Sequence, residues 1–244
     1  MTKLMMYLIR YNLHMKVYEN IIIGNFLYAL GFAVSAKSNA RINPAAVSLL
    51  QQTKADTSLA DLLLDFPGTF RLIEFKREEN ESGKEQVKQE ALVTLINAYE
   101  HGKLSSISRS CHWYIETSSK NDTLTSNIAP YIDAFPVKEK VQDFWGFVNQ
   151  TATAAFTNSE QYTPEEINEY LDFVITSNGA GDVTTGGMIL MVNADGRIDH
   201  CQLGSLNELR LEVPELIKVR SIEIEKEHAK TKQKLKSKNM GMGM

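Results

Sequence analysis

The first half of the chain opens with a helical pattern of apolar residues. Over residues 15–34 the apolar side chains recur every three or four positions, which predicts a helix with one buried face. Two short apolar runs follow, at residues 59–66 and 70–77, and they are joined at Pro67-Gly68. Proline and glycine between two apolar runs are typical of a tight turn, so we expect an antiparallel hairpin.

The segments around this hairpin predict the rest of a mixed α/β unit. Residues 41–57 read as a loop with a short helix, in which Pro44 would stand in the first turn. The sequence Ser-Gly-Lys-Glu at 82–85 fits a capping box, which predicts a helix from there to about Tyr99. Apolar and polar residues alternate over 106–117, as in a strand. The first part of the chain therefore predicts the order helix, hairpin, helix, strand.

The pattern is weaker in the second half. We expect, in chain order, a loop at 118–127, helices at 136–156 and 163–175, a flexible connector at 177–187, a hairpin at 188–203, and a charged helix from about 214 that ends in a disordered tail. The expected organisation is a core over 1–120, an extension of helices and a hairpin over 121–214 that could belong to the same domain, and the charged segment 215–244.

The net charge of −4 indicates no partner by itself, but it is unevenly distributed. Residues 226–238 hold six Lys and one Glu, so this segment is at +5 and the remainder of the chain at −9. Such a segment fits either a solvated tail or non-specific phosphate binding. The two cysteines, Cys111 and Cys201, form no disulfide framework and exclude a cysteine-built zinc site. We therefore expect a reducing, cytoplasmic location.

The apolar run at residues 21–36 could be taken for a targeting segment or a membrane span. It is preceded by a long segment containing Glu19, unlike the short basic leader of a signal peptide. It is also short for a membrane span and includes Asn25. We interpret it as a buried helix, and we expect no membrane partner.

The predicted hairpin carries charges inside its apolar strands. With a tight turn that sets Phe66 opposite Thr69, counting outward places Asp61 opposite Glu74. Lys76 lies two residues further along and shares that face, because side chains alternate with a period of two. Charged residues on strands usually form a solvated face, but the nearly continuous apolar neighbours here argue for a strand buried on both faces.

Two carboxylates side by side repel each other unless a proton or a cation lies between them. Oxygen ligands beside a lysine suit a hard cation such as Mg²⁺ better than zinc. The hairpin therefore predicts either a salt-bridged surface or a magnesium site made by Asp61 and Glu74.

The pattern Asp61, Glu74, Lys76, with the stretch IEFK at 73–76, resembles the PD-(D/E)XK nuclease superfamily. A preceding helix with a glutamate and a helix directly after the hairpin fit the same resemblance, which covers about half of the chain. The resemblance implies a restriction-endonuclease-like fold with an αβββαβ core. The strand that this core requires before Asp61 is poorly defined in the sequence, and residues 32–43 are the candidate.

The resemblance also implies roles for individual residues. Asp61 and Glu74 would hold Mg²⁺, or Mn²⁺ as a substitute, together with the Phe75 carbonyl. Lys76 would orient or help to deprotonate the attacking water and stabilise charge on the phosphate. Glu19 corresponds to the acid of the first helix that supports metal binding in many members.

Two assignments stay open. Gln86 or Gln89 resembles the glutamine that some branches carry early in the following helix. Asp65 competes with Asp61 as the hairpin acid, although the predicted register places it nearer the turn; we prefer Asp61. His112 alternates with core residues, and we interpret it as structural.

These expectations amount to a metal-dependent nuclease that hydrolyses phosphodiester bonds, with DNA favoured over RNA and with cleavage at chain ends or at internal positions left open. The alternative is a nuclease-like subunit that no longer cleaves and serves an interaction role in a nucleic-acid-processing or defence complex. A homodimer or a partner protein is compatible with either. A chance occurrence of the motif would show itself in a structure where Asp61, Glu74 and Lys76 do not share one face.

Overall fold

The strand pairings place the strands of the described residues in one mixed sheet. The computed structural model describes residues 18–39, 43, 45–51, 59–77, 83–99, 102–120, 123–135, 143–157, 162–179, 188–192 and 198–202. The strands are β1 (Ala45–Leu49), β2 (Leu62–Phe66), β3 (Thr69–Arg77), β4 (His112–Lys120), β5 (Thr123–Pro130), β6 (Met188–Val192) and β7 (Ile198–Gln202). Their order in the sheet is β5-β4-β3-β2-β1-β6-β7. The β3–β4 pair is parallel, and the other pairs are antiparallel.

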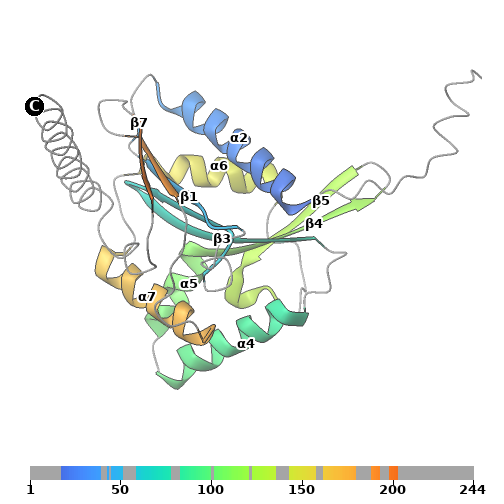
Figure 1. Cartoon of the computed structure of the whole chain (residues 1–244), viewed down its shortest axis with the longest axis vertical. Helices are drawn as coiled ribbons and strands as arrows, with labels where there is room; N and C mark the ends of the chain where they lie inside the picture. Colours follow the sequence, from blue (N-terminus) through green and yellow to red (C-terminus); the bar gives the residue numbers. More distant parts are fainter. Residues whose placement is uncertain are drawn as a thin grey trace, which may run out of the picture.

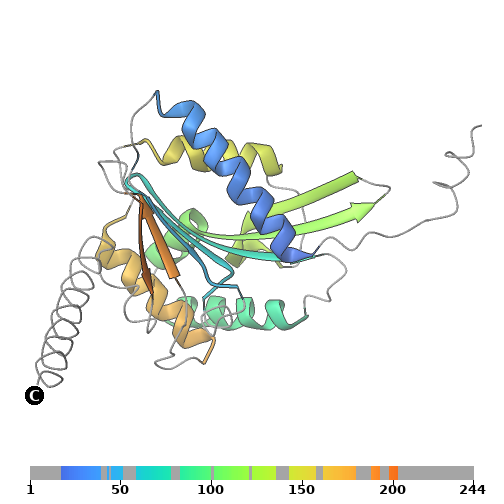
Figure 2. The same ribbon diagram turned by 45° about the horizontal axis from the view of Figure 1, so that its top comes forward.

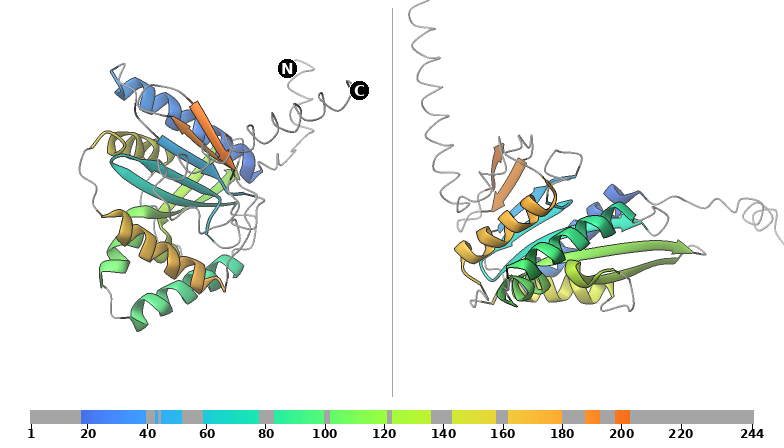
Figure 3. Two further views of the ribbon diagram at one scale, coloured as in Figure 1. Left: turned by 60° about the vertical axis from the view of Figure 1, so that its left-hand side comes forward. Right: turned by 90° about the horizontal axis from the view of Figure 1, so that it is seen from below.

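Helices cover both faces of this sheet. They are α2 (Glu19–Lys37), α4 (Gly83–Ala98), α5 (Gly102–Cys111), α6 (Phe144–Ala154) and α7 (Pro164–Ser177), with a short 3-10 turn η1 (Tyr131–Asp133). In Figure 1, α2 and α6 lie on one side of the strands and α4, α5 and α7 on the other. The rotated views in Figures 2 and 3 show the same three layers. The expectation of a mixed α/β architecture is confirmed.

The two faces of the sheet bury separate apolar cores. Leu63 of β2 and Leu72 of β3 belong to the core under α4, α5 and α7. Ile73 and Phe75 of β3 belong to the core under α2 and α6. Burial on both faces explains why these strands read as nearly continuous apolar runs.

The hairpin register predicted from the Pro67-Gly68 turn is confirmed. Phe66 pairs with Thr69, Asp65 pairs with Phe70, and Leu63 pairs with Leu72. Because a slip of one residue would exchange the two faces, this register determines which core each side chain enters. Glu74 and Lys76 therefore lie on the same face as Leu72, toward α4.

The helix predicted at 15–34 is present as α2, and its buried side follows the predicted period. The buried residues are Ile22, Ile23, Phe26, Leu30 and Ala33. Burial is limited to this side: Tyr28 is 78% exposed and Phe32 is 61% exposed. Among the described residues, α2 is the helix long and apolar enough to cross a membrane, a test that core helices and signal sequences also pass.

The prediction of a short helix within 41–57 is wrong, because residues 45–49 form strand β1. β1 pairs with β2 on one side and β6 on the other. Pairing with two flanking strands outweighs the intrinsic helical preference of its two alanines. The strand sought at 32–43 is also wrong, since α2 continues to Lys37.

The strand predicted at 106–117 is wrong in its first half, which belongs to α5. Leu104, Ile107, Ser108 and Cys111 are the buried residues of this helix. Ile107 and Cys111 are four residues apart, a spacing that places two side chains on one face of a helix and of a strand alike. The strand β4 starts only at His112.

The loop predicted at 118–127 is wrong for its described residues, because 118–120 belong to β4 and pair with 123–125 of β5, which continues through 127. β5 is at one end of the sheet, where polar side chains are tolerated and threonine favours extended backbone. The helix predicted at 163–175 is present as α7, and it begins with a capping box in which Thr163 and Glu166 are bonded reciprocally. The hairpin predicted at 188–203 is present as β6 and β7.

Several sequence predictions fall outside the described residues. They concern residues 15–17, Ser82, 136–142, most of the 177–187 connector, the turn at 194–196, and the charged helix and tail after Gln202.

Candidate functional site

A group of ionisable side chains is buried where β2, β3 and α4 meet. Asp61 and Glu74 are each 2% exposed, and Glu85, in the first turn of α4, is 4% exposed. Together with Lys76 we call these residues the acidic cluster. Carboxylates are rarely fully buried unless they are paired, so three in one place require compensation.

Direct contacts connect the members of the acidic cluster. The Lys76 Nζ lies 2.6 Å from Glu74 Oε1 and 4.0 Å from Glu85 Oε2. Asp61 directly precedes β2, and its Oδ2 accepts a 2.7 Å hydrogen bond from the Phe75 backbone N–H. The hairpin therefore brings Asp61, Glu74 and Lys76 together, as the register predicted.

Glu74 is the electrostatic centre of the acidic cluster. Burial raises its pKa well above the ordinary range, and the nearby charges of Asp61 and Glu85 raise it further, against the opposing effect of Lys76. Burial alone would lower the pKa of Lys76, but the attraction of Glu74, Asp61 and Glu85 outweighs it and raises that pKa. The cluster therefore favours a bound proton or another cation near Glu74.

Glu85 was missed as a site residue, because its spacing from Ser82 was interpreted as a helix cap. Its Oε1 accepts a 2.6 Å hydrogen bond from the Tyr131 hydroxyl of η1, and its Oε2 lies 3.4 Å from Lys88 Nζ. Together with the 4.0 Å distance from its Oε2 to Lys76 Nζ of β3, these contacts place the carboxylate between η1, α4 and the sheet. A glutamate three residues before a lysine was the available signal, but it is equally common on solvated helix faces.

The two glutamines considered for α4 take different positions. Gln86 is exposed, and its Nε2 donates a 2.9 Å hydrogen bond to Glu90 on the same helix. Gln89 is buried, one helical turn after Glu85, and its amide donates to the Ile132 carbonyl. Of the two candidates left open by the sequence, Gln89 lies on the side of α4 that faces the cluster, and Gln86 does not.

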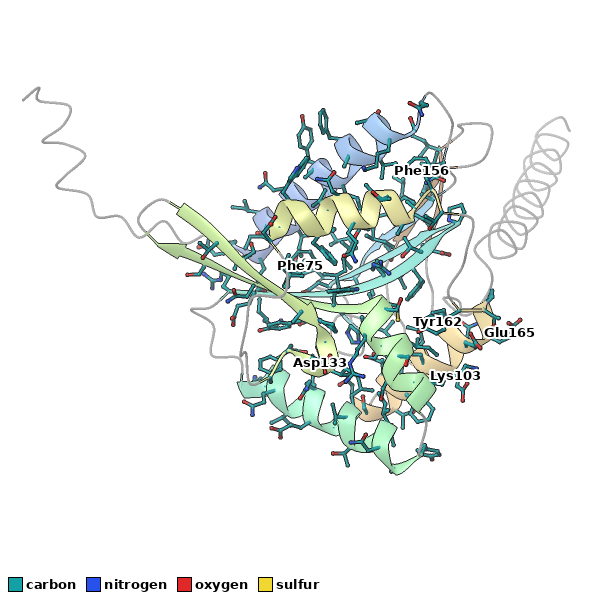
Figure 4. All side chains as sticks on the ribbon, turned by 180° about the vertical axis from the view of Figure 1, so that it is seen from behind. Phe75, Lys103, Asp133, Phe156, Tyr162 and Glu165 are labelled. Carbon is teal, nitrogen blue, oxygen red and sulfur yellow. The ribbon has the colours of Figure 1, made fainter. Side chains whose placement is uncertain are left out.

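The other residues considered from the sequence are not members of the acidic cluster. Asp65 pairs with Phe70 next to the turn, and four residues of strand separate it from Asp61. Glu19, in the first turn of α2, contributes to the electrostatic environment of Tyr114. Phe75, labelled in Figure 4, has its ring in the core with α2, at 5.6 Å from the Phe26 ring. Only the backbone of Phe75 can therefore contribute to the acidic cluster.

Tyr114 adds a polar group next to Glu74. It is the β4 residue paired with Glu74 across the parallel ladder, and it is buried. Its hydroxyl has no hydrogen-bond partner within the described part of the chain. Burial raises its pKa, and the charges of Glu116, Glu85, Glu74 and Glu19 raise it further, so it stays a neutral donor.

The side chains of the cluster do not form a ready-made metal cage. Within the described ranges, no group of three or more His, Cys, Asp and Glu side chains is arranged to hold a metal ion. Mg²⁺ is usually held by only one or two carboxylates and retains several waters. The pair Asp61 and Glu74 meets that smaller requirement.

A series of buried polar side chains extends from the acidic cluster toward α5 and α7. The Tyr131 ring stacks on His112 with ring centres 4.1 Å apart. His112 Nδ1 lies 2.7 Å from the Tyr170 hydroxyl, which is 2.8 Å from Ser108 Oγ. His112 is buried, and the interpretation of this residue as structural stays a prediction. Burial also raises the pKa of the nearby Cys111 thiol to about 12, so it is no nucleophile at neutral pH.

We expect His112 to make the fold acid-sensitive. Burial lowers its pKa to about 3, so the folded protein keeps it neutral while the unfolded chain takes up a proton below about pH 6.5. Stability is therefore lost as the pH falls, by about 2 kcal/mol between pH 7 and pH 5 for this one group. Urea unfolding at both pH values measures it. His112→Asn retains a polar group toward Tyr170, and this variant should lose that part of the pH dependence; an unchanged slope would contradict the assignment.

Comparison with known proteins provides no relative from which a role could be transferred. No protein-family model matches the chain, and neither does any curated protein or solved structure. The function must therefore be argued from the acidic cluster itself.

Proposed function

We propose that this protein is a metal-dependent nuclease that hydrolyses phosphodiester bonds, with the acidic cluster as its active site. The observation that carries the proposal is the burial of Asp61 and Glu74 beside Lys76, joined by Glu85 from the following helix. The chain order α2, β1, β2, β3, α4, α5, β4 supports a restriction-endonuclease-like arrangement, with α5 as an additional helix before the last core strand.

In this proposal each residue of the acidic cluster has a separate role. Asp61 and Glu74 would hold Mg²⁺, which when bound supplies Lewis-acid stabilisation of the phosphate. Lys76 remains protonated, because its acidic neighbours raise its pKa, and it therefore acts as a cation toward the phosphate or the attacking water. Glu85, held by Tyr131, lies 4.0 Å from the Lys76 ammonium group and would help to position it.

Two features support a substrate rich in phosphate. The acidic cluster has three carboxyl groups, and the lysines that contact them are Lys76 and Lys88. A bound divalent cation would balance the negative charge and allow an anionic ligand to bind. The buried Tyr114 hydroxyl beside Glu74 lacks a partner in the described structure. An unsatisfied donor at this place is available to water or to a phosphate oxygen.

The test is metal-dependent cleavage of a nucleic-acid panel by the full chain. Single- and double-stranded DNA and RNA, linear and circular, are incubated with Mg²⁺, Mn²⁺, Ca²⁺ or a chelator. We expect cleavage with Mg²⁺ and Mn²⁺, preferentially of DNA, and none with the chelator. Cleavage of circular DNA would identify an endonuclease.

The absence of a ready-made metal cage among the described side chains supports one other function. In that alternative the protein binds nucleic acid or a partner without cutting it. Binding of the same panel in every metal without cleavage would favour this alternative and exclude the nuclease.

We expect Mg²⁺ binding to release a proton from the acidic cluster. The raised pKa of Glu74 means that its carboxyl group retains a proton to higher pH than usual, and a cation must displace it. Mg²⁺ affinity should therefore increase as the pH rises through the pKa of Glu74. Calorimetry in two buffers of different ionisation enthalpy measures the protons released. Glu74→Gln should remove this release, and a buffer-independent enthalpy for the unmodified chain would contradict the prediction.

A further inference from the structure

Lys88 of α4 is a positively charged residue next to the acidic cluster. Its Nζ lies 3.4 Å from Glu85 Oε2, the same oxygen that lies 4.0 Å from Lys76 Nζ. One buried carboxylate oxygen therefore has two ammonium groups beside it. Catalysis as proposed above requires Lys76 and leaves Lys88 without a role.

The two lysines are more exposed than the carboxylates that they contact. The side chains of Lys76 and Lys88 are 22% and 28% exposed, whereas those of Glu74 and Glu85 are almost completely buried. In the view from below in Figure 3, α4 lies on the near side of the molecule. An anion that approaches from solvent therefore reaches the ammonium groups before the carboxylates.

Buried aromatic residues hold the shared carboxylate in place. Glu85 Oε1 accepts a 2.6 Å hydrogen bond from the Tyr131 hydroxyl, and the Tyr131 ring stacks on His112. The pKa of His112 is lowered first by burial and then by the charge of Lys88, so this lysine lies within electrostatic range of the same stack. Because Glu85 is fixed, the two ammonium groups beside it are prepositioned for a ligand.

The charges of the acidic cluster give Lys88 a purpose beyond an ion pair within one helix. A glutamate and a lysine three residues apart on a helix often pair without any ligand. Here Asp61, Glu74 and Glu85 carry three negative charges when all are ionised. One divalent cation and Lys76 balance these charges. The charge of Lys88 is then in excess and available to an anionic ligand.

A buried hydroxyl is a second indication of a ligand at this place. Tyr114 is 2% exposed, and its hydroxyl has no hydrogen-bond partner within the described ranges. The charges of Glu85 and Glu74 contribute to its raised pKa after burial and Glu116, so the hydroxyl lies in their field. A buried donor normally has a partner in a native structure. A phosphate has enough acceptor oxygens for this hydroxyl and for ammonium groups.

We infer that Lys88 binds the phosphate next to the one that is cleaved, so that the site holds two consecutive phosphates of one nucleic-acid strand. The inference rests on the proposed nuclease activity and adds the substrate class, a strand with at least two phosphodiester groups. Phosphates follow each other about every 3.4 Å along the axis of one strand of a duplex. Two ammonium groups that share one carboxylate oxygen match such closely spaced anions.

The salt dependence of nucleic-acid binding tests the inference on the full chain. Duplex DNA is titrated with Ca²⁺ in place of Mg²⁺, to keep the strands intact. We expect Lys88→Gln to lower the affinity about 10-fold at about 0.15 M salt. The slope of log K against log salt should decrease by about 0.9, the value for one phosphate contact. In a chelator the substitution should have little effect, because the three carboxylates then neutralise Lys88.

Two further variants control for charge and for folding. Lys103→Gln also removes a lysine that contacts a glutamate, Glu166 of α7, and it should change neither the affinity nor the slope. Lys88→Arg retains the positive charge and should retain the slope. Thermal unfolding of each variant sets the temperature at which all the chains are folded, so that a loss of stability is not mistaken for a loss of binding.

Short substrates provide a second measurement. A dinucleoside monophosphate has one phosphodiester group, whereas a trinucleoside diphosphate has two. The ratio of kcat/KM for the longer substrate to that for the shorter one should be about 10-fold lower in Lys88→Gln than in the natural chain.

The outcomes separate this inference from the proposed function. A natural chain that cleaves DNA, with affinity and salt slope unchanged by Lys88→Gln, would overturn the inference and leave the nuclease. An equal loss of affinity with Ca²⁺ and with chelator would also overturn it, because the contact would not depend on the cluster. Binding that depends on Lys88 without cleavage would support the phosphate site and exclude the nuclease. A natural chain that binds no nucleic acid would overturn both.

Discussion

Glu74→Gln should reduce nucleic-acid cleavage by about 10³-fold or more without unfolding the protein. The substitution removes a carboxylate that would hold the cation and that forms the 2.6 Å ion pair with Lys76. Because burial and the charges of Asp61 and Glu85 raise the pKa of Glu74, its ionised form is unfavourable in the folded protein. Replacing it by a neutral side chain of the same size should therefore not lower the melting temperature at pH 8. Initial cleavage rates and thermal unfolding measure the two effects.

The matched control uses the two aspartates of the hairpin. Asp61→Asn should lose activity to a similar degree, since Asp61 lies within the electrostatic range of Glu74. Asp65→Asn should retain it, because Asp65 pairs with Phe70 beside the turn. Loss of stability in parallel with activity in Glu74→Gln would identify a structural role for the cluster, and equal activity of Asp61→Asn and Asp65→Asn would contradict the assigned site.

Gly68→Ala should destabilise the fold by about 3 kcal/mol or more. A Cβ atom at Gly68 would come closer than 3.0 Å to the backbone oxygens of Thr157 and Ala154, at the carboxyl end of α6. Backbone atoms at a helix end cannot rotate away as a flexible side chain can, so either the hairpin or α6 must shift. Guanidinium unfolding measures the loss.

Gly102→Ala is the control for the Gly68 prediction. A Cβ atom at Gly102, the first residue of α5, meets nothing within 4 Å, so its stability should change by only about 0.5 kcal/mol. A similar small change for Gly68→Ala would show that the turn and α6 are not packed as closely as the structure describes.

Sequence alone was sufficient for the features that depend on near neighbours in the chain. The two-residue turn at Pro67-Gly68 and the period of two along a strand determine the pairing of Leu63 with Leu72, and hence the shared face of Asp61, Glu74 and Lys76. The apolar period likewise identified the buried side of α2. These are short-range rules of backbone geometry, and they hold whatever packs on the hairpin or the helix.

Features that depend on distant partners were decided by the tertiary structure. Residues 45–49 are extended because β2 and β6 flank them, and β6 lies more than a hundred residues later in the chain. Glu85 is a member of the cluster because η1 brings the Tyr131 hydroxyl to it. The rotation of α4 on the sheet buries Gln89 and exposes Gln86, a choice that the sequence of the helix leaves open.

At Gly68, the sequence determined one property and the tertiary structure determined another. From the sequence, a glycine after proline indicates a turn that needs its conformational freedom. In the structure its backbone does not adopt the left-handed region, and the reason for glycine is the close approach of the α6 carbonyl groups. The chain by itself determined that a turn forms there. Only the packing of the carboxyl end of α6, 86 to 89 residues later in the chain, determined that the turn has no room for a side chain. Steric exclusion depends on which atoms come into contact in the folded protein, and the local sequence does not contain that information.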